Sequence, residues 1–204
     1  YTTTGSTILN DIEALPKGLL FWRSSTHFLG GIGVVIFMLL ILPSASTFRM
    51  RLSKMEISSL SQENYKFKTK QTIKVISSVY VGLTFMAIIL LKVAGMGWFD
   101  AVNHAFSVVA TGGFSTKNLS ILHYHSFPIE LVMYTFMLLA SIHFGLLYIS
   151  VTKRSFTIFK SSVIKFYMGT LLVMTVIVTL NVYFSGTVEN FLLSLRQGAF
   201  MVVS

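Results

Sequence analysis

The sequence predicts an all-α membrane protein built from repeated units, in which a short half-helix lies between two long helices. Of the 204 residues, 53% are hydrophobic and only 11% are charged, whereas a soluble domain carries about 25% charged residues. Four stretches without Lys, Arg, Asp or Glu are long enough to cross a bilayer. A half-length amphipathic stretch that ends in Thr-Gly-Gly lies between two of them, and parts of it recur elsewhere.

Each long uncharged stretch predicts one membrane-spanning helix, because about 20 apolar residues cross the ~30 Å hydrocarbon core of a bilayer. Allowing for flanking residues, we expect helices near 16–43, 72–94, 128–152 and 163–185. Pro16 and Pro128 suit a first helical turn, and Pro43 marks a stop or a kink.

The basic residues predict the orientation of these spans. Eleven of the 16 Lys and Arg residues lie in the connectors after the first and the third span, and such a bias places both connectors on the cytoplasmic side. The net charge of +9 therefore mostly reflects the basic residues that orient the spans in the membrane. We expect these residues to contact membrane lipid, and we expect no nucleic-acid partner. Segment 49–70 is interpreted as a solvated cytoplasmic loop, with a docking surface for a cytosolic regulator as the alternative.

The half-length stretch begins at Trp98 and breaks at Thr111-Gly112-Gly113. About 11 helical residues at about 1.5 Å each reach only half of a ~30 Å core. Non-helical backbone at that depth needs protein or a water cavity to shield it, which favours a re-entrant pore loop. Glycine lets the backbone turn its carbonyls toward an ion. An extracellular helix with a type II turn is the alternative that Gly-Gly also permits.

The unit recurs on both sides of this stretch. Ala-Phe-Ser-Val-Val-Ala at 105–110 returns as Ala-Phe-Met-Val-Val-Ser at 199–204. The segment Thr-Thr-Thr-Gly-Ser-Thr at 2–7 matches the loop without its helix when Gly5 is aligned with Gly113. We therefore expect the chain to be a fragment of a longer protein.

Further ordered motifs surround the two loops. They are Leu-Pro-Lys at 15–17, Phe-Trp-Arg at 21–23, Leu-Gly-Gly-Ile-Gly at 29–33, Ile-Leu-Pro at 41–43, Gly-Trp-Phe-Asp-Ala at 97–101, His-Ala-Phe-Ser at 104–107 and Thr-Gly-Gly-Phe-Ser-Thr at 111–116. In order and spacing they resemble Trk-type potassium uptake proteins, of the superfamily of Trk, Ktr and plant HKT cation transporters. The resemblance implies repeated helix–pore loop–helix units of a potassium-channel-like pore, with re-entrant pore helices.

The resemblance also implies which residues form a potassium selectivity filter. They are Thr3, Thr4, Gly5, Thr111, Gly112, Gly113 and Phe114. Potassium would be bound by the backbone carbonyls of Thr4, Gly5, Gly112 and Gly113. In the superfamily, glycine at the first filter favours potassium, whereas serine there goes with sodium transport in some plant relatives.

The function that the resemblance implies is potassium uptake across the bacterial inner membrane by a multi-pass, pore-forming subunit, with no enzymatic step and no bound cofactor. The implied partners are a second copy in a homodimer and a cytosolic nucleotide-binding regulatory subunit. The alternative is the membrane anchor of a sensor or of an intramembrane enzyme. That alternative needs several ionisable residues within the spans, and only His143 lies deep in one.

The same resemblance divides the chain into five segments. They are 1–43, the filter loop and second helix of repeat one; 44–71, a cytoplasmic basic loop; 72–152, repeat two with its pore helix and filter; 153–162, a cytoplasmic loop; and 163–204, repeat three up to its filter.

Four further residues are candidates for filter support or gating. Gly31 and Gly33 favour close helix packing, with a gating hinge as the alternative. Arg23 lies near the outer end of its span and is expected to snorkel, or to brace the pore helix through loop carbonyls. His143 is expected to be a neutral histidine inside the bundle, with a pH-sensitive role as the alternative. Asn118 matches a glycosylation sequon, which we interpret as a false positive.

Overall fold

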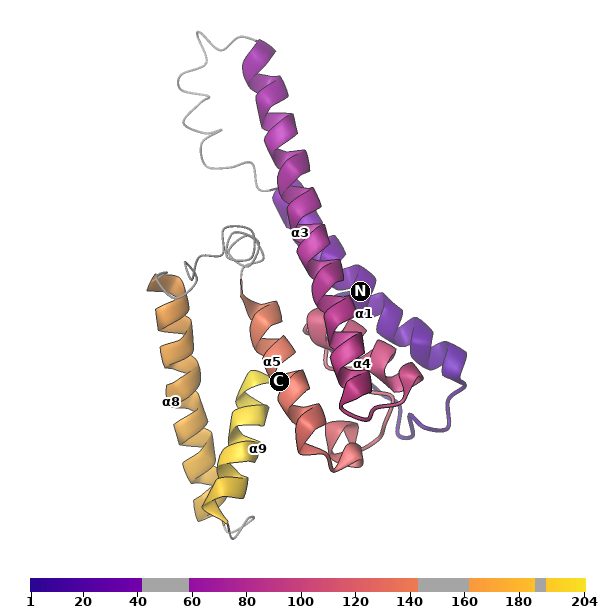
Figure 1. The fold of residues 1–204 in the computed structure, drawn as a ribbon, viewed down its shortest axis with the longest axis vertical. Helices are drawn as coiled ribbons and strands as arrows, with labels where there is room; N and C mark the ends of the chain where they lie inside the picture. The colour runs from indigo at the N-terminus through magenta and orange to yellow at the C-terminus, as the bar shows by residue number, and fades with distance from the viewer. Residues whose placement is uncertain (42–58, 143–161, 186–189) are drawn as a thin grey trace.

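The computed structural model describes residues 1–41, 59–142, 162–185 and 190–204, and all regular structure within them is helical (Figure 1). In chain order the elements are α1 (Lys17–Ile41), α3 (Ser59–Val93), α4 (Trp98–Val109), the 3-10 helix η1 (Ser120–Tyr124), α5 (Phe127–Ser141), α8 (Ser162–Phe184) and α9 (Phe191–Val203). The predicted all-α class is confirmed.

A short helix folds back against a long one twice in the molecule. Helix α4 packs against α3 and also contacts α1 and α5, while α9 packs against α8 and contacts α5 (Figure 1). The chain turns between α3 and α4 at Gly95, whose φ of 105° is a conformation that glycine tolerates readily. The alternation of long and short helices that the sequence predicts is therefore present in both pairs.

The core lies where α4 meets α3 and α5. Its buried members include Ala101 and Ala105 on α4, whose small side chains let a neighbouring backbone come close. The larger buried side chains around them are Tyr80, Leu83, Leu91, Met96, Ile121, Ile129, Met133 and Phe136. Burial on this scale holds α4 in place, and so fixes where the loop after it begins.

Helix α3 begins at Ser59, although the sequence predicts a helix start near residue 72. The loop prediction for 49–70 is therefore wrong from residue 59 onward, and residues 42–58 lie outside the described part of the chain. Segment 59–71 contains neither Gly nor Pro, and about half of its residues are Lys, Gln, Leu or Glu, which are good helix formers. Hydropathy detects only the apolar part of a helix. The predicted start of α3 is therefore too late in the chain, because its first residues are polar.

Helix α5 ends at Ser141, whereas the sequence predicts one helix over 128–152. Ile142 is extended, with φ −79° and ψ 141°. The Ser141 hydroxyl donates to the Leu138 carbonyl at 2.7 Å and lies 2.7 Å from the Tyr167 hydroxyl of α8. A serine hydroxyl that bonds a backbone carbonyl in this way competes with the hydrogen bonds of the helix. Hydropathy does not report such a bond, so it does not predict this helix end. His143 lies outside the described residues.

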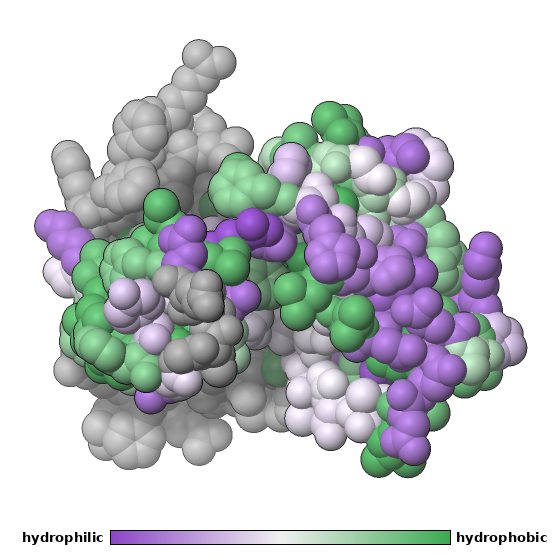
Figure 2. Space-filling view, turned by 90° about the horizontal axis from the view of Figure 1, so that it is seen from below, coloured by the Kyte–Doolittle hydropathy of each residue, from purple (hydrophilic) through white to green (hydrophobic). Residues whose placement is uncertain are grey.

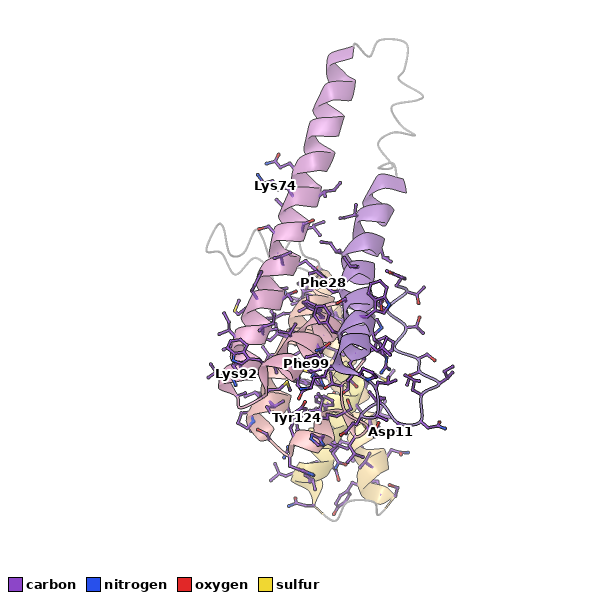
Figure 3. All side chains as sticks on the ribbon, turned by 90° about the vertical axis from the view of Figure 1, so that its right-hand side faces the viewer. Asp11, Phe28, Lys74, Lys92, Phe99 and Tyr124 are labelled. Atoms are coloured by element: carbon purple, nitrogen blue, oxygen red, sulfur yellow. The ribbon has the colours of Figure 1, made fainter. Side chains whose placement is uncertain are left out.

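Two described segments, Ile73–Val93 and Ile164–Phe184, are long and apolar enough to cross a membrane. The predicted spans 16–43 and 128–152 both run into residues outside the described part. Lys74 and Lys92 lie toward the two ends of the first segment, as expected of snorkelling side chains (Figure 3).

The surface also separates hydrophilic from hydrophobic residues. Seen from below, hydrophilic residues gather on the side of α1 and the loops, while hydrophobic residues dominate around α8 and α9 (Figure 2). Helix α8 exposes several large apolar side chains, including Phe166, Leu172 and Phe184.

We predict that Gly198→Ala loosens the packing of α9 on α8. A Cβ there would lie 2.6 Å from Thr179 Oγ1 and 3.1 Å from Thr179 N, and overpacking of this kind costs about 1–3 kcal/mol. The melting temperature of the detergent-solubilised full-length protein should fall. Gly169→Ala, where no atom lies within 4 Å of the added Cβ, should leave it unchanged or slightly higher. Equal shifts for both variants would contradict the packing argument.

Candidate functional site

The two Thr/Gly loops share one unusual backbone pattern. Thr3 and Gly5 have φ of 53° and 71°, and Thr111 and Gly113 have φ of 52° and 78°. A left-handed conformation costs an ordinary residue about 1–2 kcal/mol, so its presence at both threonines indicates a constraint from the surroundings. A type II turn needs positive φ at only one residue. The pattern therefore differs from the ordinary turn that the sequence also permitted.

The two loops also lie against one another. A Cβ added to Gly5 would overlap the carbonyl oxygen of Gly112, while one added to Gly113 would meet nothing within 4 Å. The structure thus brings together two predicted filter segments that are far apart in sequence. Glycine is required at position 5 for two reasons, the positive φ and this close approach.

Helix α4 leads directly into the second loop. Its last residue is Val109, and the Gly112 N–H donates to the Ser107 carbonyl at 2.8 Å, which closes the helix end. The C-terminus of a helix carries a partial negative charge. Because the loop follows this terminus directly, the arrangement favours a cation near the loop rather than an anion.

Phe114 is held by two side chains from successive turns of α1. The His27 ring stacks on it at 3.7 Å between centroids and 9° between planes, and the Arg23 guanidinium carbon lies 3.8 Å from the ring centroid. Cation–π and stacking contacts of this kind keep the ring in one orientation. Arg23 therefore reaches the loop through an aromatic ring rather than through carbonyls, and its Nη1 has no hydrogen-bond partner among the described residues.

His27 also explains why residue 112 is glycine. A Cβ at Gly112 would overlap the imidazole ring, whose Nδ1 lies 3.5 Å from Ser107 Oγ. The first loop carries Thr4 at the matching position. Sequence reasoning missed His27, although a histidine inside an apolar span was a usable signal.

The glycines of α1 differ from one another. A Cβ on Gly31 would lie 2.7 Å from the Tyr80 hydroxyl and 3.0 Å from Ala110 Cβ, so its environment agrees with close packing. Gly33 has no described atom within 4 Å of such a Cβ. The Tyr80 hydroxyl donates to the Phe28 carbonyl at 2.9 Å and joins α3 to α1. Gating roles for the two glycines stay predictions.

The chain that leaves the second loop is tied to the first two turns of α4. The Thr116 hydroxyl donates to Asp100 Oδ1 at 2.6 Å, and Ser115 Oγ lies 3.0 Å from His104 Nε2. His104 Nδ1 lies 2.8 Å from the Asp100 carbonyl, which can only accept a hydrogen bond. Nδ1 therefore carries a proton, and in the neutral ring with that tautomer Nε2 accepts from the Ser115 hydroxyl.

Helix α9 is joined to α5 by an ion pair. Arg196 donates to both carboxylate oxygens of Glu130, with two contacts of 2.6 Å. Bidentate pairs of this type fix orientation as well as distance. A cavity of about 590 Å³ lies between the second loop, α5 and the end of α9. Its lining includes Gly113, Met133, Met137, Phe200 and Ser204.

Together these features define a class of protein. Half-length helices fold back against long apolar ones, and paired Thr/Gly loops with left-handed residues meet at the end of such a half-helix. This is the architecture of a cation transport protein with re-entrant pore loops. A sequence model of the TrkH family, described as cation transport protein, matches residues 1–195. The chain belongs to this family, whose members are membrane ion transporters rather than enzymes.

Individual relatives agree with this family. The Trk system potassium uptake protein TrkH of Halomonas elongata is 34% identical over 205 residues, and that of Escherichia coli strain K12 is 31% identical over 205. Each alignment covers 100% of this chain and 42% of the relative. The crystal structure of the potassium transporter TrkH from Vibrio parahaemolyticus superposes with a TM-score of 0.82 at 25% identity, covering 99% of this chain and 41% of that one.

We predict that Gly112→Ala destabilises the protein because the new methyl group overlaps His27. His27→Ala removes the obstacle, so the double variant should lose less stability than the sum of the two single variants. A positive coupling of this kind is measured by a double-mutant cycle on thermal unfolding of the full-length protein. Gly82→Ala on α3, where the added Cβ meets nothing within 4 Å, is the control. Strict additivity would show that the two residues do not touch.

Proposed function

We propose that this chain supplies two adjacent filter loops of a potassium pathway, as part of the pore-forming subunit of a Trk-type uptake system in the bacterial inner membrane. The observation that carries the proposal is the matched pair of left-handed loops meeting at Gly5 and Gly112. The relatives are named as potassium uptake proteins, and this chain spans 42% of their length. The family membership makes the membrane-anchor alternative the less favoured one.

The proposed chemistry is replacement of a hydration shell. Carbonyls of Thr4, Gly5, Gly112 and Gly113 would coordinate potassium in place of water. The C-terminus of α4 adds partial negative charge near the loop. Entry follows the membrane potential, which contributes about 2.3 kcal/mol per elementary charge per 100 mV. No bond is made or broken, so the chain needs no catalytic residue and no cofactor.

The residues around the loops would keep these carbonyls in place. Thr3 and Thr111 begin the two left-handed stretches, and Phe114 anchors the second loop to α1. Arg23 is a filter-support residue in this proposal because of its contact with Phe114. Gly31, Gly33 and His143 remain gating candidates.

The proposed assembly includes membrane lipid, a second copy of the subunit and a cytosolic nucleotide-binding regulator. The name "Trk system" on the relatives supports association with other Trk components. The basic connectors after the first and third spans would face the cytoplasm and offer the regulator a surface. The division into the five segments 1–43, 44–71, 72–152, 153–162 and 163–204 is part of the same proposal, except that residues 59–71 form the first part of α3 and are not loop.

Serine substitution at the two filter glycines tests the proposal. Gly113→Ser adds a side chain where there is space, so its cost is the positive φ alone. Gly5→Ser also drives its Cβ into the Gly112 carbonyl. We expect both variants to lower the potassium-to-sodium uptake ratio, with Gly5→Ser the more damaging, in cells that lack their own potassium uptake systems and express the full-length protein.

The matched control is Gly18→Ser, which lies outside the loops and whose Cβ would meet no atom within 4 Å. It should behave as wild type in the same growth and uptake assays. If wild type fails to support growth at low potassium, the proposed function is wrong. If wild type transports potassium and both loop variants keep its selectivity, the loops are not the filter.

A further inference from the structure

The segments that follow the two filter loops are bonded to one another, and Asn118 makes most of the connection. Its Oδ1 accepts from the Ile12 N–H at 2.7 Å, and its Nδ2 donates to Asp11 Oδ1 at 2.9 Å. Its own N–H donates to Glu13 Oε1 at 3.3 Å. Lys117 adds an ion pair with Glu13 at 3.6 Å. We call these five residues the inter-loop clip; Figure 3 labels Asp11 on its loop beside α1.

Each half of the clip makes further hydrogen bonds to its own side of the molecule. On one side, Ser115 and Thr116, just before Asn118 in the chain, are hydrogen-bonded to the first two turns of α4. On the other side, the Asp11 carboxylate accepts the N–H groups of Glu13 and Ala14 at 3.0 and 3.3 Å, which shapes the turn leading into α1. A movement of the clip would therefore displace the chain that follows each loop.

An asparagine side chain suits this position because one amide offers a donor and an acceptor at once. It faces a carboxylate with its NH₂ group and a backbone N–H with its oxygen. An aspartate would keep the acceptor, lose the donor and bring a third carboxylate beside Asp11 and Glu13. The partners thus require the amide itself, rather than any polar side chain.

The Asp11 carboxyl is ionised when it accepts from Asn118. Hydrogen bonds, first of all that from Asn118, hold the pKa of the exposed Asp11 carboxyl below its usual value. A lowered folded-state pKa means that the contribution is present above the unfolded pKa and is lost only as pH falls through the folded one. Both values are acidic, so Asp11 stays ionised during growth.

We propose that Asn118 is a positioning residue for ion selection, which sets the first filter loop in register with the second through Asp11 and Ile12. The inference rests on the proposed function. Discrimination between potassium and sodium depends on how carbonyls from different loops are held around the ion. The loops themselves meet by close approach at Gly5 and Gly112, and Asn118 adds directional bonds that fix their offset.

The test is the potassium-to-sodium uptake ratio of the full-length protein, in cells without their own potassium uptake, with protein in the membrane measured by immunoblot. Asn118→Asp and Asp11→Asn each break the amide–carboxylate bond, and we expect each to lower the ratio several-fold. The double variant Asn118→Asp/Asp11→Asn swaps the two groups. Its new amide at position 11 can donate to the new carboxylate at 118, so it should recover most of the wild-type ratio.

The control is Asn10→Asp, which adds a carboxylate next to Asp11 on an exposed residue and should leave the ratio unchanged. Two results would overturn the proposal. The first is opposite changes in total uptake for Asn118→Asp and Asp11→Asn at an unchanged ratio, which would show that charge alone acts. The second is a double variant, Asn118→Asp/Asp11→Asn, that is present in the membrane at the wild-type level but does not recover the wild-type potassium-to-sodium uptake ratio. Absence of potassium uptake by wild type would instead remove the proposed function, and this inference with it.

Discussion

Backbone that leaves regular structure at membrane depth must be shielded, and in the proposed pore this constraint governs the arrangement of the molecule. Residues 3–5 and 111–113 have neither helical nor strand geometry, so their polar groups need protein or a hydrated path around them. Helix α4 ends at Val109, and the second loop begins directly after it. The packing of α1, α3 and α5 around α4 provides the wall that makes such a loop possible.

Support for the second loop comes from three directions. The Phe114 ring is clamped by Arg23 and His27 from α1, which act on the middle of the loop. Asp100 and His104 hold the chain just after it. The inter-loop clip acts farther along and ties this chain to the segment before α1. A typical hydrogen bond contributes only about 0.5–1.5 kcal/mol, so the loop depends on several such contacts acting at successive positions along the chain.

The repeats share backbone geometry more closely than packing. Left-handed residues fall at matching positions in the two loops, yet Gly112 faces the His27 ring where the first loop has Thr4. In the two half-helices, His104 of α4 corresponds to Gly198 of α9. The histidine bonds the loop that follows it, whereas the glycine packs against Thr179 of α8. Such differences allow each repeat to fit its own neighbours while the loop backbone stays the same.

The sequence by itself determined the helical class, the family, and the half-helix at Trp98, because apolar periodicity and Gly-containing loops are local properties. It failed at Ser59 and Ser141, where a polar helix extends and an apolar one stops for reasons that hydropathy does not report. Only the tertiary structure decided that His27 demands glycine at 112, and that Asn118 is a structural amide rather than an isolated sequon. Both depend on contacts between residues about 85 to 107 positions apart, and no local pattern encodes which distant side chain will fill a given space.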